Sequence, residues 1–193
     1  MTLEDGQTLD VVAEIRTMLN ALLLGRQDVT DLATVGRSKF EQWLKFEMAA
    51  SLAKHGEFSD VAVEQQYGAG AEKADIAFTV NDTRWFVELK TPNTSWRARG
   101  VEVKTKNVTD NISEVIVDMA KLRRNCPPDN GLSVFVLFPV PTRIWTGEQS
   151  KMNLHLDRIE GACKLNQGEL LQNANFVALS PDYGVVPFVI KVV

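Results

Sequence analysis

The chain has 193 residues, a formal net charge of −4, 45% hydrophobic residues and 24% charged residues. This composition is that of an ordinary globular protein, and the absence of internal repeats excludes the repeat architectures. The acidic balance argues against strong nonspecific binding to nucleic acid, because such binding depends on neutralising phosphates. The length predicts one domain spanning residues 1–193.

No targeting or membrane segment is evident. The apolar run at 18–24 is too short to span a bilayer, and acidic residues precede it. Cys126 and Cys163 lack metal-ligand spacing, so free thiols are expected, and His55 and His155 have no visible partners for zinc. We therefore predict a cytoplasmic protein without a membrane partner.

The first 36 residues are expected to add a helix. Apolar residues recur there at helical spacing, and Gly25 closes the pattern. Six acidic residues against two basic ones make this segment a poor surface for phosphates, which favours a role in packing or self-association.

A second helix is predicted over residues 38–55. Ser38 and Glu41 form an S-x-x-E capping box, and Gly56 follows as a stop signal. Glu47 projects into the apolar face of this helix, where an ionised carboxylate needs a partner. The alternative is that Glu47 lies at the edge of the face and reaches water. The apolar face comprises Phe40, Trp43, Leu44, Met48 and Ser51.

Three strands follow, and the last two are predicted to form a hairpin. Residues 61–65 alternate as a strand, and Asn81-Asp82 is a turn between strands that contain Asp75 and Glu88. A two-residue turn places Asp75 directly across from Glu88, with Cβ atoms about 5 Å apart. Two facing carboxylates repel each other, so a hard cation such as Mg²⁺ would relieve the arrangement. A register slip of one residue would put the two acids on different faces.

The remaining elements complete an α/β pattern. A helix begins at Thr109 or Asp110, and its last turn carries basic residues that suit the helix dipole or, alternatively, contact phosphate. The unbroken apolar run at 132–140 predicts a central strand covered on both faces. Residues 141–193 are expected to form a β-rich extension with strands near 176–179 and 185–193. The basic residues are Lys121, Arg123 and Arg124.

The spacing of Asp75 from Glu88-Leu89-Lys90 resembles the motif of the PD-(D/E)xK nuclease superfamily, also called restriction-endonuclease-like. Ala74 stands where the family name has proline. The resemblance covers about residues 38–140 and implies an αβββαβ core with a mixed central sheet flanked by helices. Strand-borne Glu-x-Lys pairs are also common as solvent-facing salt bridges, which is the alternative interpretation of the motif.

The resemblance implies a Mg²⁺-dependent endonuclease, with Mn²⁺ as a substitute metal, that cuts DNA in preference to RNA. It leaves restriction, repair and phage-defence roles open, of which a restriction-type or defence enzyme is the one we expect. It assigns the catalytic roles to Asp75, Glu88, Lys90 and Glu47, and the metal site to Asp75, Glu88, Leu89 and Glu47. It also implies a homodimer. The alternative is a catalytically inactive nuclease-like module that binds nucleic acid or a protein partner.

A basic loop leaves the strand that carries Glu88. Between Lys90 and Lys106 there are five basic residues and one acid, together with an aromatic residue that could stack on a base. The alternative is a solvated loop without a ligand. The predicted nucleic-acid-binding residues are Trp96, Arg97, Arg99, Lys104 and Lys106.

Overall fold

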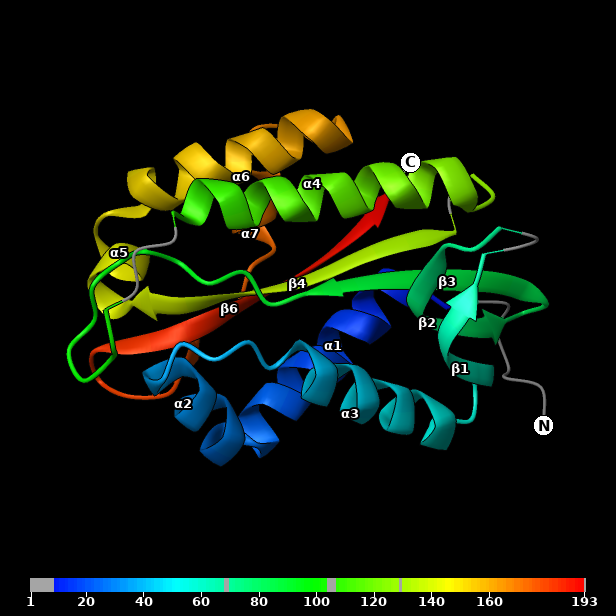
Figure 1. The fold of residues 1–193 in the computed structure, drawn as a ribbon, viewed down its shortest axis with the longest axis horizontal. Helices are drawn as coiled ribbons and strands as arrows, with labels where there is room; N and C mark the ends of the chain where they lie inside the picture. The colour runs from blue at the N-terminus through cyan, green and yellow to red at the C-terminus, as the bar shows by residue number, and fades with distance from the viewer. Residues whose placement is uncertain (1–8, 68–69, 104–106, 129, 193) are drawn as a thin grey trace.

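The computed structural model describes residues 9–67, 70–103, 107–128 and 130–192. These residues form an α/β fold in which a six-stranded mixed sheet is flanked by helices on both faces (Figure 1). The helices are α1 (Val11–Gly25), α2 (Gln27–Val35), α3 (Glu41–Lys54), α4 (Val108–Asn125), α5 (Thr142–Thr146), α6 (Gln149–Cys163) and α7 (Glu169–Gln172). The strands are β1 (Ser59–Gln66), β2 (Lys73–Val80), β3 (Thr83–Lys90), β4 (Gly131–Pro141), β5 (Val177–Ala178) and β6 (Tyr183–Val192).

The strand order is β1-β2-β3-β4-β6-β5. Strands β3 and β4 run parallel, with α4 as their crossover, and the other neighbours are antiparallel. The predicted succession of helix, three strands, helix and strand is therefore present as α3, β1, β2, β3, α4 and β4. The apolar run at 132–140 forms the interior strand β4, which is buried along its whole length.

The helices pack as two layers. Helices α1 and α3 cover one face of the sheet, and α4 and α6 cover the other (Figure 1). The central strands therefore contribute to two apolar cores. Ile76 and Val87 face α1 and α3, whereas Ala77 and Phe86 face α4 and α6.

The predicted hairpin has the expected turn and register. Asn81 and Asp82 both adopt positive φ values, 46° and 60°, as a two-residue turn with right-handed strand twist requires. Val80 pairs with Thr83, and the pairing continues as far as Ile76 with Val87. The predicted register is thus confirmed between these two pairs, and Asp75 and Glu88 are the next residues beyond the last pair.

The structure corrects the expected helix boundaries near the N-terminus. Helix α2 does not follow from the sequence pattern, because its buried side chains include Thr30 and Thr34 and give no apolar periodicity. The predicted capping box is also wrong: α3 begins at Glu41, after Phe40, and no side chain caps it. The Glu41 carboxylate is therefore available for other contacts.

The extension at 141–193 is less β-rich than expected. The two predicted strands are present as β5 and β6, which pair antiparallel, but α5, α6 and α7 precede them. Helix α6 mixes Met152, Leu156 and Ile159 with buried His155 and Glu160, which blurs the helical pattern in the sequence. No helix in the described ranges combines the length and the apolar character that a bilayer crossing requires.

Candidate active site

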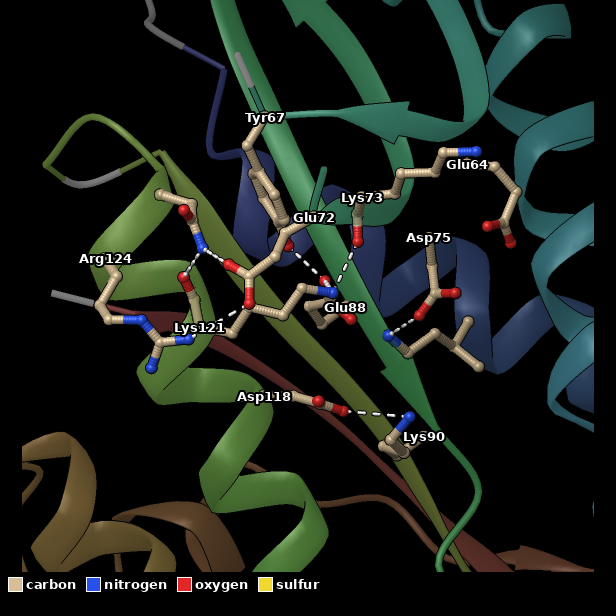
Figure 2. Close-up of polar contacts among 12 residues, drawn as sticks. Glu64, Tyr67, Glu72, Lys73, Asp75, Glu88, Lys90, Asp118, Lys121 and Arg124 are labelled. Atoms are coloured by element: carbon tan, nitrogen blue, oxygen red, sulfur yellow. Dashed lines mark hydrogen bonds and ion pairs between the residues drawn. The ribbon is translucent and has the colours of Figure 1, made fainter. Parts of the chain in front are cut away.

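The carboxylate of Asp75 lies where β2 and β3 stop pairing. If the register continued beyond Ile76 and Val87, the amide of Leu89 would face Ala74. That amide instead donates to Oδ2 of Asp75 at 2.8 Å (Figure 2). A main-chain hydrogen bond thus fixes the Asp75 side chain at the opening between the two strands.

Glu88 is a deeply buried acid, with 4% of its side chain exposed. Its Oε1 lies 2.6 Å from the ammonium of Lys121 on α4, and it accepts a hydrogen bond from the Tyr67 hydroxyl. The pKa of Glu88 is raised to about 7: burial and the charge of Asp75 raise it, and this outweighs the opposite effect of Lys121 and Tyr67. Glu88 is therefore a carboxyl group whose charge depends on its immediate partners.

Lys90 points between α3 and α4. Its Nζ lies 3.1 Å from Oδ2 of Asp118 (Figure 2). It also lies 3.5 Å from Oε1 of Glu41. Burial opposes the charged form, but the charges of Asp118 and Glu41 outweigh it and raise the pKa of Lys90 above its ordinary value. Lys90 therefore carries a fixed positive charge at neutral pH.

A third lysine, Lys45 of α3, reaches the same region from the other face of the sheet. Its side chain is 2% exposed, contacts Glu64, and lies 3.5 Å from Oδ1 of Asp75. Burial again opposes the charge, and the two carboxylates outweigh it and raise the pKa of Lys45. Glu64 lies across from Asp75, because the neighbouring pairs are Val63 with Ile76 and Gln65 with Ala74.

Acids therefore lie at neighbouring positions of three strands. The sequence predicts that a metal ion balances their charge, but in the structure lysine side chains do so. Lys45 is shared between Glu64 and Asp75, and Lys121 pairs with Glu88. Within the described ranges, no three His, Cys, Asp or Glu side chains are gathered as a preformed metal cage. The polar centre, as we call this group, consists of Glu41, Lys45, Glu64, Asp75, Glu88, Lys90, Asp118 and Lys121.

The donors nevertheless suit Mg²⁺ in kind. Mg²⁺ is commonly held by one or two carboxylates, with water and substrate phosphate completing its shell, and not by a full protein cage. Asp75 and Glu88 provide two such carboxylates, and the main chain of Leu89 directly follows Glu88 and bonds to Asp75. An ion on Glu88 would take the position that Lys121 now fills.

Glu47 does not join the polar centre. Its Oε1 lies 3.3 Å from Nη1 of Arg26, and 36% of its side chain is exposed. The predicted face of α3 is rotated by about one residue from the observed one, because the buried residues include Lys45 and Leu52. Lys45 lies at helical spacing from Met48 and Leu52 and so belongs to the buried face of α3. The prediction missed it because only apolar residues were used to define that face.

Three further residues of the polar centre do not follow from the sequence patterns. The capping interpretation of Glu41 hid its contact with Lys90, and no pattern singled out Asp118. Lys121 suits the helix dipole, but it bonds to Glu88 and to the carbonyl oxygen of Lys73 at 2.6 Å (Figure 2). Asp118 and Lys121 are three residues apart on α4 and so share a helix face. This spacing in the sequence could have indicated that Asp118 and Lys121 act at one site.

The predicted nucleic-acid-binding loop is only partly available for binding. Trp96 is half-buried, packs on the α4 and α6 core, and has its ring 6.1 Å from that of His155. It is therefore not an open stacking platform. Arg97 and Arg99 border solvent, whereas Lys104 and Lys106 lie outside the described residues.

Arg37, between α2 and α3, holds the start of this loop. The residue is 2% exposed, and its guanidinium donates to the carbonyl oxygens of Glu102, Thr94 and Trp96 and lies 2.9 Å from Oδ1 of Asn93. A guanidinium carries several N–H donors in a planar fork, so it can bond to acceptors at different positions, whereas a lysine ammonium cannot reach them all. Arg37 thus fixes the chain immediately after Lys90.

We expect Arg37→Lys to lower the free energy of unfolding by about 2 kcal/mol, because buried acceptors lose a charged donor. The loop between β3 and α4 should also be cut faster by thermolysin. Urea denaturation and timed proteolysis measure the two effects. Arg124→Lys is the matched control, because Arg124 is exposed and contacts Glu72 at 3.5 Å. Equal stability of the two variants would contradict the structural role of Arg37.

The raised pKa of Glu88 predicts a pH-dependent stability. Because the folded protein binds this proton more tightly than the unfolded chain, the free energy of unfolding falls as the pH rises from about 4.5 to 7. We expect wild-type protein to lose up to about 3 kcal/mol more over this range than Glu88→Gln, which cannot ionise. Urea denaturation in chelator measures the difference, with Glu57→Gln as an exposed control. Identical pH profiles for wild type and Glu88→Gln would refute this assignment.

Comparison of the chain with protein-family models, with curated proteins and with solved structures finds no match.

Proposed function

We propose that the protein is a Mg²⁺-dependent nuclease that hydrolyses phosphodiester bonds, in DNA in preference to RNA, at the polar centre. The observation that carries the proposal is the position of Asp75 where β2 and β3 stop pairing, close enough for its charge to act on both Glu88 and Lys90. Two carboxylates and a fixed cation from adjacent strands are the groups that metal-assisted phosphoryl chemistry uses.

Each residue has a role that follows from its contacts. Asp75 is oriented by the Leu89 amide, and Glu88 must be ionised and released from Lys121 to serve as a ligand. The metal, when bound, would lower the pKa of a water and stabilise charge on the phosphate. Lys90 is held as a cation, so it suits orientation of the water or neutralisation of developing charge, and not proton abstraction.

The fold supports the same proposal. The succession from α3 to β4, with three antiparallel strands followed by a parallel crossover, agrees with the restriction-endonuclease-like core that the sequence resembles. Membership of that superfamily, a role in restriction or defence, and homodimerisation all belong to the proposal. Sedimentation at several concentrations tests the dimer.

A second candidate is a catalytically inactive module that binds nucleic acid or a protein. The observation that favours it is the pairing of both acids with lysines, Lys45 on Asp75 and Lys121 on Glu88. A carboxylate that already has a lysine partner has less electrostatic demand for an ion.

One experiment separates the two candidates. Supercoiled, linear and single-stranded DNA and RNA are incubated with the protein in Mg²⁺, in Mn²⁺ and in chelator. The nuclease proposal expects cutting of DNA with either metal and none in chelator. Binding without cutting under every condition would favour the inactive module, and cutting that persists in chelator would place the chemistry elsewhere.

A further inference from the structure

An open cleft of about 700 Å³ lies at the far end of β4. Three arginines line it, from two segments that are distant in sequence: Arg97 and Arg99 from the loop after β3, and Arg143 from α5. The sequence links the first two to nucleic acid, but nothing in it connects Arg143 to them. Asp182 is the one acid among the described residues that line the cleft.

Three arginine residues line this one cleft, although the chain as a whole is acidic. Pro141 and Thr142, which directly precede Arg143, also line the cleft. A concentration of arginine on an otherwise acidic protein marks a local site for an anion with several oxygens, because a guanidinium binds phosphate through paired donors.

The position of the cleft relates it to the polar centre. Figure 1 shows the loop after β3 running along the sheet to the end where α5 begins. Lys90 pairs with Phe135 of β4, and Pro141 at the cleft lies six residues farther along that strand. At about 3.3 Å per residue, the two places are about 20 Å apart.

We propose that this arginine cleft, defined by Arg97, Arg99 and Arg143, holds the phosphate backbone of the same polynucleotide that the polar centre cleaves. The inference rests on the proposed function and deepens it. Since phosphates on one strand of a duplex advance by about 3.4 Å per base pair, the cleft contacts the backbone about six base pairs from the scissile bond. The substrate is therefore an extended polynucleotide, and a mononucleotide or a free phosphate is too small to reach both places.

Binding is measured by fluorescence anisotropy with a fluorescein-labelled duplex of about 24 base pairs in chelator, at several salt concentrations. We expect Arg143→Ala and Arg97→Ala each to weaken binding about five- to tenfold. Each should also reduce the slope of log K against log salt by about 0.9 for every phosphate that the variant no longer neutralises. Lys54→Ala, at the C-terminal end of α3, removes the same charge away from the cleft and should leave the slope unchanged.

Cleavage of duplexes of increasing length supplies a second readout. Wild-type kcat/KM should rise between about 8 and about 24 base pairs, because a duplex of about 8 base pairs that is cut near its middle extends only about four base pairs to either side and does not reach the cleft. Arg143→Ala should cut the shortest duplex as well as wild type does and should gain little from added length.

Three outcomes would count against these ideas, and they are distinguishable. An unchanged salt slope and an unchanged length dependence in Arg143→Ala, with wild type active, would overturn the cleft and leave the proposed function standing. Failure of wild type to cut any polynucleotide in metal would instead remove the proposed function. Inorganic phosphate that displaces the duplex at low millimolar concentration would show a small-anion site and refute the extended substrate.

Discussion

Lys90→Ala is expected to lower the rate of single-turnover DNA cleavage in Mg²⁺ by about a thousandfold, the effect typical of a positioned polar group in a transition state. Lys90 is held 3.1 Å from Asp118 and 3.5 Å from Glu41, so its charge is fixed beside Asp75 before substrate arrives. Because its pKa is raised, the wild-type rate should show no titration of this lysine near neutral pH.

Lys39→Ala is the control for this prediction. Lys39 also links the start of α3 to α4, through Glu114 at 3.4 Å, but about half of its side chain is exposed. It should change the rate by less than about threefold, as expected for an exposed ion pair. Lys90→Met guards against a folding defect, since it keeps much of the length of the side chain and removes the charge. Full cleavage by a folded Lys90→Met protein would exclude the role assigned to Lys90.

The second large effect is expected for Asp75→Asn. We expect Mn²⁺ binding to weaken by about a hundredfold, equivalent to about 2.7 kcal/mol, and metal-dependent cleavage to be abolished. Asparagine keeps a side-chain oxygen that can accept from the Leu89 amide, so the opening between β2 and β3 should persist. Calorimetric titration with Mn²⁺, together with thermal unfolding, separates loss of the ligand from loss of the fold.

Asp82→Asn provides the matched control within the same hairpin. Asp82 is exposed in the turn with φ of 60°, a conformation that asparagine adopts readily, so neither stability nor metal binding should fall. Equal Mn²⁺ affinity of wild type and Asp75→Asn would contradict metal binding at this carboxylate. It would favour the inactive module, in which Lys45 remains the partner of Asp75.

The lysines define how such a centre would have to work. Glu88 can bind an ion only when Lys121 leaves it, and Tyr67 then remains as its hydrogen-bond donor. The surrounding α4 residues belong to a well-packed apolar face, so movement is easiest in the Lys121 side chain and not in the helix. The ion and the ammonium are therefore alternative partners for one carboxylate.

Local sequence determined the elements of the core and the hairpin register. Apolar residues at the helical period defined α1, α3 and α4, and the unbroken run at 132–140 defined β4, because these patterns arise within one segment. The register followed from Asn81-Asp82, since a two-residue turn leaves one pairing for the strands on either side. Asp75 and Glu88 were found by the same local argument.

Only the tertiary structure decided which charges meet. Lys45, Asp118 and Lys121 come from helices on opposite faces of the sheet, and their encounter with the strand acids depends on how α3 and α4 pack. Arg143 joins Arg97 and Arg99 for the same reason, through the end of β4. Periodicity within a segment indicates which side of that segment is buried, but it carries no information about the partner that buries it. The sites of this protein are therefore assembled by packing between elements whose individual forms their own sequences already specify.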